Sequence, residues 1–276
     1  MSLKITTLIE NTVSDSCRLE SEHGLSFFIE KDDLKLLFDT GQSGAFLANA
    51  EALKINPADA DYVLLSHSHY DHCGGFRALA ESADDFQLIT GCGFFEPKYS
   101  YQKRSYRYLG CGFDGSYLAE RGIRHRECFA PLTKLSEGVF VLTDFPRRHE
   151  DETINPRFVF RTEDGNRPDS FYDEIMLALY TVQGWVLVLG CCHPGFRNML
   201  DAAKDRLGGR IHAVLGGTHL VEASADTLEE TLAYLRASGI AHLGLSHCTG
   251  PSAIRALSAA FPSYFHNNCG TVFTAE

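Results

Sequence analysis

The sequence contains no hydrophobic run that approaches the roughly 18–20 apolar residues needed to cross a bilayer, so we expect no membrane-spanning helix. The N-terminal stretch MSLKITTLIENTVSDS also lacks the long apolar segment of a secretory signal, which favours a cytoplasmic location. The nine cysteines are odd in number and include no C-x-x-C pair. This pattern argues against a disulfide framework and fits a reducing compartment.

Positive charge is scarce as well. The chain has 25 Lys and Arg against 36 Asp and Glu, which gives a formal net charge of −11. Nucleic-acid binding depends on basic contacts with phosphates, so this balance excludes a general nucleic-acid-binding role. A bound divalent cation would be favoured instead. The 276 residues, 44% of them hydrophobic, are enough for a sizeable core, and we expect a single domain over residues 1–276.

Short apolar runs separated by helical patterns predict an α/β protein. The predicted strands cover residues 25–30, 34–40, 61–66, 86–90, 138–143, 185–190, 211–217 and 241–247. The predicted helices cover residues 44–53, 76–82, 194–207, 226–239 and 251–261. Because the strands are apolar on both faces, we expect sheet inside and helices outside.

The segment 91–131 differs from the rest of the chain. It is aromatic, locally basic and only weakly periodic, which indicates an irregular insertion. One interpretation is a surface loop; the other is a lid over a pocket, in which tyrosine and arginine contact an anionic substrate. Lys98, Arg104 and Arg107 are expected at the surface unless the segment folds over the site.

The stretch VLLSHSHYDHCGGF carries the strongest functional signal. His67, His69, Asp71 and His72 follow a predicted buried strand within six positions. Residues two apart on an extended segment point the same way, so His67 and His69 are placed to share one ion. The turn at the following glycines directs Asp71 and His72 elsewhere, toward a second ion. Imidazole and carboxylate ligands suit zinc, iron or manganese.

Other histidines repeat the same arrangement. His193 follows the strand at 185–190, His219 follows the strand at 211–217, and His247 ends the strand at 241–247. If these strand ends lie on one edge of a sheet, the histidines converge, and binding sites of α/β proteins gather at such edges. We expect His193 and His247 to be ligands, and His219 to lie beside the metals as a proton donor or substrate contact.

These blocks resemble the metallo-β-lactamase superfamily. H-x-H-x-D-H after a buried strand, followed by Gly-Gly and a helix, is its most specific motif, and EHGLSFFIE, GCCHPG, GGTHL and SHCTG resemble further blocks of one branch. That branch includes the methanopterin-pathway enzyme family that joins a dihydropterin to a β-ribofuranosylaminobenzene phosphate, and uncharacterised metal-dependent hydrolases. The resemblance implies an αββα sandwich, with two mixed sheets inside, helices on both outer faces and metals at one sheet edge.

The resemblance also implies a set of metal ligands for two divalent ions per chain, with zinc expected first and iron or manganese as alternatives: His67, His69, Asp71, His72, His193 and His247. His67 and His69 match the first site, and we choose His193 to complete it. Asp71, His72 and His247 match the second site. Asp71 would in addition orient the nucleophile, and His219 resembles the histidine with which some superfamily phosphodiesterases protonate a leaving group.

The chain departs from the family pattern in two ways: it lacks a clear counterpart of the usual mid-chain histidine block, and it lacks the bridging acid. Many members have a Thr-Gly-Asp whose aspartate bridges the two metals, whereas this chain has Leu189-Gly190-Cys191. Cys191 as a thiolate ligand, or an acid such as Asp144 or Asp173 from elsewhere, could replace it; cysteines here could equally be small buried residues.

Two residues near the motifs keep alternative roles. Asp39 is either the partner of a ligating histidine or a cap of the turn before the helix at 44–53. His23 either faces the pocket or is structural. The mid-chain histidines His125 and His149 lie in contexts that match no family block.

The expected function is a metal-dependent hydrolase that uses a metal-activated water on an ester, lactone or phosphoester of a small, anionic molecule. The alternative is a metal-dependent transferase or synthase that acts on a pterin-type substrate. A redox protein on the same scaffold is disfavoured, because we find no flavodoxin-like partner domain in the 276 residues. A non-catalytic metal sensor is disfavoured to a similar degree, although fold alone does not exclude it.

Overall fold

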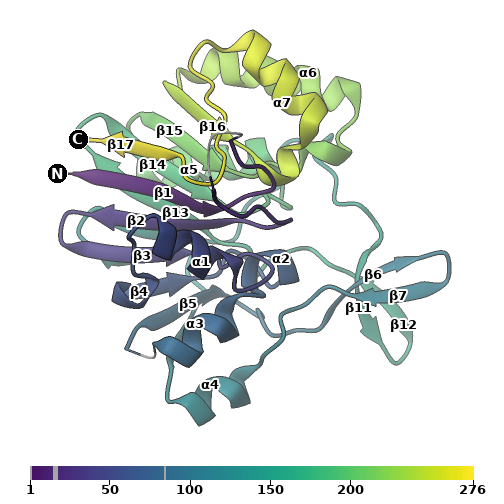
Figure 1. The fold of residues 1–276 in the computed structure, drawn as a ribbon. Coiled ribbons are helices and arrows are strands. Elements are labelled where there is room, and N and C mark those ends of the chain that lie inside the picture. The colour runs from purple at the N-terminus through teal and green to yellow at the C-terminus, as the bar shows by residue number, and fades with distance from the viewer. Residues whose placement is uncertain (1, 15–17, 84) are drawn as a thin grey trace.

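The computed structural model describes residues 2–14, 18–83 and 85–276, which form two facing sheets with helices outside them (Figure 1). The seven-stranded sheet has the order β17 (Val272–Ala275), β1 (Leu3–Ile9), β2 (Ser26–Lys31), β3 (Leu34–Phe38), β4 (Tyr62–Leu64), β5 (Gln87–Gly91) and β8 (Arg124–Cys128). The six-stranded sheet has the order β16 (His242–Leu245), β15 (Ile211–Gly216), β14 (Gly184–Leu189), β13 (Met176–Thr181), β10 (Val139–Leu142) and β9 (Leu132–Ser136).

Seven α-helices are formed by the described residues: α1 (Ala45–Ala52), α2 (Tyr70–Cys73), α3 (Phe76–Ser82), α4 (Gly115–Arg121), α5 (Phe196–Leu207), α6 (Ala225–Ser238) and α7 (Gly250–Ala260). Short 3-10 turns lie at Pro57–Asp59, Leu220–Glu222 and His247–Thr249. The longest of these helices, α6, has 14 residues, and none of those described is long and apolar enough to cross a membrane.

Alternating side chains explain why the layers stack as they do. Along β14, Val186 and Val188 belong to the core cluster between the two sheets, while Leu187 and Leu189 belong to the cluster beneath α5, α6 and α7. Successive side chains of a strand point to opposite faces of the sheet, so a strand that is apolar throughout contributes side chains to the cores on both faces. A third cluster, with Phe46 of α1 among its members, lies between the seven-stranded sheet and α1, α3 and α4. The predicted αββα sandwich is confirmed.

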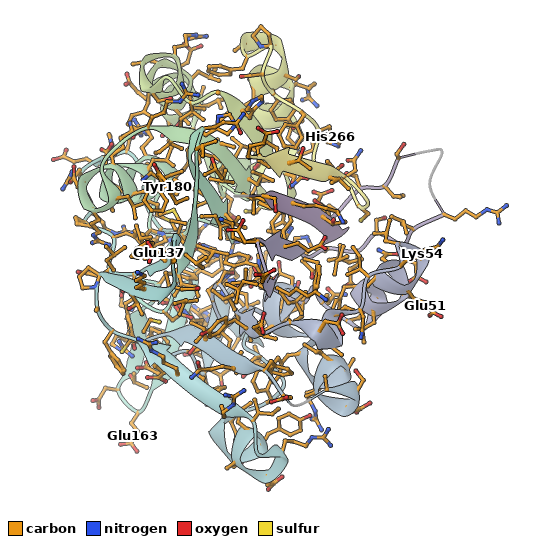
Figure 2. The ribbon with its side chains drawn as sticks, turned by 90° about the vertical axis from the view of Figure 1, so that its left-hand side faces the viewer. Glu51, Lys54, Glu137, Glu163, Tyr180 and His266 are labelled. Atoms are coloured by element: carbon orange, nitrogen blue, oxygen red, sulfur yellow. The ribbon has the colours of Figure 1, made fainter. Side chains whose placement is uncertain are left out.

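The side chains fill these layers from one outer surface to the other. Figure 2 shows Glu51 and Lys54, at the end of α1, on the opposite side of the molecule from Glu137 and Tyr180, which lie near the six-stranded sheet. All four are exposed. Each predicted strand and helix overlaps an observed one, with ends that differ by a few residues.

The segment 91–131 is regular, contrary to the prediction. Within it, β6 (Lys98–Gln102) and β7 (Ser105–Tyr108) form a hairpin, α4 follows, and β8 joins the seven-stranded sheet. The hairpin pairs with β11 (Phe158–Thr162) and β12 (Gly165–Pro168) in a four-stranded sheet of order β12-β11-β6-β7. This sheet projects from the sandwich on the side of α2 (Figure 1). Its two edge strands, β7 and β12, are exposed along their whole length, so they lack the apolar alternation that identifies a strand from sequence.

A buried ion cluster joins the four-stranded sheet to the sandwich. Lys98 of β6, expected at the surface, is instead buried, and its Nζ donates to Asp169 and Asp173 at 2.7 Å each. The other carboxylate oxygen of Asp173 accepts the backbone N–H of Ser68, next to the first two histidines of the motif, at 3.1 Å. Lys98 therefore fixes the position of the projecting sheet relative to the histidine loop.

The Lys98→Met substitution is expected to cost about 3–5 kcal/mol of unfolding free energy, because it leaves two buried carboxylates without their cation. Denaturant unfolding measures the loss. Lys134→Met is the matched control, because Lys134 and its partner Glu137 are 52% and 86% exposed and such pairs contribute about 0–1 kcal/mol. Equal losses in the two variants would contradict a structural role for the buried cluster.

Candidate metal centre

Parallel strands bring the candidate ligands to one edge of the sandwich. β3, β4 and β5 are mutually parallel in one sheet, and β14, β15 and β16 in the other. The histidine loop follows β4, and residues 191–193, 219 and 247 follow β14, β15 and β16. The carboxyl ends of parallel strands share an edge, so residues far apart in sequence meet there.

The first group consists of His67, His69 and His193. Their ligand atoms lie within 4.8 Å of one another, and all three side chains are buried. Burial lowers the pKa of each well below the usual range, which leaves neutral imidazoles, the form that binds metal. The Nε2 atom of each has no hydrogen-bond partner among the described residues. Buried polar atoms are rarely left unpaired, so the group fits a metal ion that these nitrogens would bind.

The second group is built around Asp71. Its Oδ2 lies 3.4 Å from His247 Nε2, 3.8 Å from His72 Nε2 and 3.1 Å from His23 Nε2. Burial opposes the charge on Asp71, but the neighbouring histidines hold the pKa of its carboxyl well below the usual range. The structure therefore places His23 at the site, which resolves the alternative that the sequence left open. The His23 side chain is 54% exposed, whereas Asp71, His72 and His247 are buried.

Hydrogen bonds on the far side of the rings orient the histidines. His72 Nδ1 lies 2.7 Å from Asp39 Oδ2, and His247 Nδ1 lies 2.9 Å from Asn11 Oδ1. Both rings consequently direct Nε2 into the site, and the two Nε2 atoms are 3.1 Å apart. Burial alone would lower the pKa of His72, but the carboxylates of Asp39 and Asp71 raise it to about 9. Such outer partners fix ring orientation and strengthen ligands.

Asp39 is a partner of a ligand candidate and not a helix cap. Its two oxygens accept hydrogen bonds from the backbone N–H and the hydroxyl of Ser66, at 2.7 and 2.8 Å, in addition to contacting His72. The cap position of α1 is Gly44, with no side-chain cap. Asp39 adopts a left-handed backbone (φ 59°), an uncommon conformation that aims its carboxylate inward.

Glu174 is a residue that sequence reasoning missed. It is fully buried before β13, and its carboxylate accepts three backbone N–H groups: from His193 at 2.8 Å, from Cys191 at 3.2 Å and from Cys192. Burial raises the pKa of Glu174 to about 8, although the N–H groups from Cys192 and His193 oppose the shift. The acid therefore holds the 191–193 loop in place. The only sequence signal is an acidic pair directly before a hydrophobic strand.

Two cavities meet at this centre. The larger, about 570 Å³, is lined by His69, Asp71, Arg107 and Arg157, among others. The smaller, about 430 Å³, lies toward Glu152 and the loop at 153–156. Phe158, His193 and His219 line both cavities. Arg157 pairs with Glu222, which lines the smaller cavity, so this ion pair lies where the two meet.

His219 stands beside the first group of histidines. Its ring centroid is 4.2 Å from that of His193, and its Nδ1 is 3.8 Å from Glu222 Oε2. Burial lowers the pKa of His219 to about 4, against the opposing effect of Glu222. Arg104 lies in the β6–β7 turn and does not line either cavity, whereas Arg107 does.

Relatives of the chain agree with this geometry. A protein-family model described as the metallo-β-lactamase superfamily matches residues 21–110, which contain the histidine motif. The 7,8-dihydropterin-6-methyl-4-(β-D-ribofuranosyl)-aminobenzene-5'-phosphate synthase of Methanocaldococcus jannaschii is 30% identical over 269 residues, covering 90% of this chain and 88% of that protein. The chain belongs to the metallo-β-lactamase superfamily. The superfamily is one of metal-dependent enzymes, and the grouped side chains fit that dependence.

Solved structures of metallo-β-lactamase proteins share the architecture. The crystal structure of Tm1679, described as a metal-dependent hydrolase of the β-lactamase superfamily, superposes with a TM-score of 0.85 at 28% identity and covers 98% of each chain. Zinc-bound PqqB from Methylobacterium extorquens matches with a TM-score of 0.60 at 12% identity, covering 98% of this chain and 99% of that one. The second likeness concerns the fold alone.

Neither acid considered as a replacement bridge is available in this chain. Asp144 is exposed, and the carboxylate of Asp173 is already bound by Lys98 and by the backbone N–H of Ser68. Cys191 instead lies within the ligand groups. Gly190 before it is required by close packing, because a Cβ there would lie 2.2 Å from Ser66 Oγ and 3.4 Å from His67 Nδ1.

Zinc added to chelator-treated protein is expected to raise the unfolding temperature, because an ion that binds only the folded state at 100 times its Kd stabilises by about 2.7 kcal/mol. The His67→Ala and His193→Ala variants should lose most of this increase. His266→Ala is the control, because His266 is exposed and outside the ligand groups. Thermal unfolding with and without zinc measures the effect; an undiminished increase in His67→Ala would contradict the site.

Proposed function

We propose that this protein is a metal-dependent hydrolase that cleaves an ester, lactone or phosphoester in a small, anionic molecule. One observation carries the proposal: buried nitrogens of His69 and His193, which have no partner among the described residues, border a cavity that is also lined by Arg107 and Arg157. Such a cavity combines metal ligands with donors for an anionic group. The similarity to the metal-dependent hydrolase Tm1679 supports the same class.

The chain offers ligands for two divalent ions, with zinc favoured by the nitrogen-rich donor set and iron or manganese as alternatives. His67, His69 and His193 would hold the first ion. Asp71, His72 and His247 would hold the second, with His23 at its solvent side. Bound ions of this kind supply a Lewis acid and a nucleophilic water at neutral pH.

The remaining roles fall to side chains that face the cavities. Asp71 has an oxygen beside three histidines and would orient the nucleophile by accepting a hydrogen bond. Arg107, whose Nη2 lies 3.2 Å from the Tyr70 hydroxyl, would hold the anionic group together with Arg157. His219 lines both cavities, where it would donate a proton to the departing oxygen. Because burial lowers the pKa of His219 to about 4, this role requires the negative charge of the bound substrate to raise that pKa. Tyr70 and Phe158 offer aromatic faces for a flat ring.

A second candidate is a synthase that acts on a pterin-type substrate. The methanopterin-pathway relative supports it, and so do the two cavities that meet at His193 and His219, because they leave room for two reactants. The same ligands would serve either reaction. Product analysis distinguishes the two: a hydrolase consumes the activated substrate in water alone, and a synthase requires the aminobenzene co-substrate.

A panel of phosphomonoesters, phosphodiesters, lactones and activated pterins, assayed with zinc-loaded protein, tests the function. Arg107→Ala and Arg157→Ala are expected to raise KM for anionic substrates roughly 10- to 100-fold, because each loses a charge-assisted hydrogen bond of about 1.5–3 kcal/mol. Arg104→Ala is the control, because Arg104 lies outside both cavities. Unchanged KM in the two cavity variants would contradict the anionic-substrate proposal, and no turnover of any substrate would contradict the hydrolase proposal.

His219→Ala tests the proton donor. General acid catalysis contributes about 10²–10⁴-fold, so kcat should fall by that order for an alkyl ester whose leaving group needs a proton. The loss should be small for a nitrophenyl ester, whose leaving group departs unprotonated. Metal content is measured in parallel to confirm that the ions remain bound. Equal losses with the two leaving groups would assign His219 to substrate binding instead.

A further inference from the structure

We propose that the Cys191 thiolate is a metal ligand that lies between the two metal positions and bridges them. The inference rests on the two-ion centre proposed above. It concerns a residue type that is absent from the histidine motif and that could otherwise be a small buried side chain. When the ions bind, the thiol proton passes to solvent and sulfur coordinates the metal with no change in oxidation state.

The position of the sulfur carries the inference. Cys191 shares one ligand group with His67 and His72, and another with His247 and Cys248. His67 belongs to the first metal group, whereas His72 and His247 border Asp71 in the second. Within these groups the ligand atoms lie within 4.8 Å of one another. Cys191 thus neighbours ligand candidates of both the first and the second metal group, as a bridging ligand requires.

The contacts of the His72 ring also support a metal ligand at Cys191. Its Nδ1 is engaged by Asp39, so Nε2 is the atom available to a metal. That Nε2 lies 3.2 Å from Cys191 Sγ and 3.1 Å from His247 Nε2. Two nitrogens and one sulfur therefore converge on the same small, buried region. All three side chains are at most 4% exposed.

The backbone holds Cys191 in this orientation. Glu174 accepts its N–H, and the close packing of Gly190 against Ser66 leaves the preceding residue no freedom to shift. The next residue shows the contrast: Cys192 Sγ turns away, donates to the carbonyl of Gly217 at 3.2 Å and packs in the helix-side core. Of these two adjacent cysteines, only Cys191 belongs to a ligand group.

Cys248 is less suited to the bridging role, although it shares one group with Cys191. Its sulfur accepts the backbone N–H of His219 at 3.2 Å and contacts the carbonyl oxygen of Cys191 at 3.5 Å. These backbone contacts occupy the sulfur of Cys248, and its group does not include His67. Cys248 therefore helps to hold the loops that carry His219 and Cys191.

The charge of the two proposed ions gives a further reason to expect a thiolate ligand at Cys191. Two divalent ions bring four positive charges into a buried region, and buried charge is stable only when it is compensated. Among the described residues, Asp71 is the only carboxylate in the candidate ligand groups. A thiolate at Cys191 adds a second negative charge in direct contact with the ions, which a thiol or an apolar side chain would not.

X-ray absorption at the zinc edge, combined with metal analysis on zinc-loaded full-length protein, tests the inference. Sulfur scatters at about 2.3 Å from zinc, and nitrogen or oxygen at about 2.0–2.1 Å. The wild type should bind about two ions and show the sulfur distance. Cys191→Ser and Cys191→Asp should lose it, and Cys191→Asp should retain about two ions, because a carboxylate is also an anionic ligand. Cys192→Ser and Cys248→Ser should keep both the ions and the sulfur distance.

The outcomes separate this inference from the proposed function. About two ions in the wild type with no sulfur distance would overturn the thiolate ligand and leave the metal-dependent hydrolase intact. A sulfur distance that persists in Cys191→Ser and disappears in Cys248→Ser would assign the ligand to Cys248 and overturn the role of Cys191. A single ion with sulfur scattering would overturn the bridge. Wild-type protein that binds no zinc would overturn both proposals together.

Discussion

Buried imidazole nitrogens that have no partner among the described residues are the constraint on which the rest of this structure depends. A polar atom removed from water costs free energy unless it is bonded, and His67, His69 and His193 each direct an unpaired Nε2 atom to one point. Elsewhere at the centre the protein satisfies such atoms itself, as Asp39 does for His72. The difference indicates which atoms a metal would bind and which ones hold the ligands in place.

Holding these side chains requires unusual backbone conformations. Asp39, Cys192, His219 and His247 all adopt left-handed φ angles between 52° and 62°, although none is glycine. Such conformations cost of order 1–3 kcal/mol each and persist where the surrounding structure enforces them. Here the surrounding structure includes the Glu174 carboxylate, which accepts three backbone N–H groups from one ligand loop. The strained backbone conformations and the hydrogen bonds that stabilise them therefore both lie at the sheet edge where the parallel strands end.

The projecting four-stranded sheet forms one wall of the larger cavity at this edge. Ser100, Gln102, Ser105 and Arg107 from the β6–β7 hairpin line the larger cavity, so the chemistry of that wall depends on how the sheet is anchored. Lys98 supplies the anchor through Asp169 and Asp173, and its ammonium also lies 4.3 Å from the ring centroid of Phe171, which stacks on His193. This cavity wall and a metal ligand candidate are thereby connected through one buried cation.

The α/β class, eight of the strands and the histidines that follow them were determined by the sequence itself, because local apolar periodicity and the H-x-H-x-D-H spacing need no tertiary information. Tertiary structure alone decided the roles of Glu174, His23 and Asp39, and it moved Lys98 from the expected surface into the interior. Those residues act through partners that are distant in sequence: Asp39 and His72 are 33 positions apart, Lys98 and Asp173 are 75 apart. Contacts at such separations arise only once the sheets pair, and no local pattern encodes them. The exposed strands of the four-stranded sheet escaped prediction for the same reason, because pairing and not burial defines them.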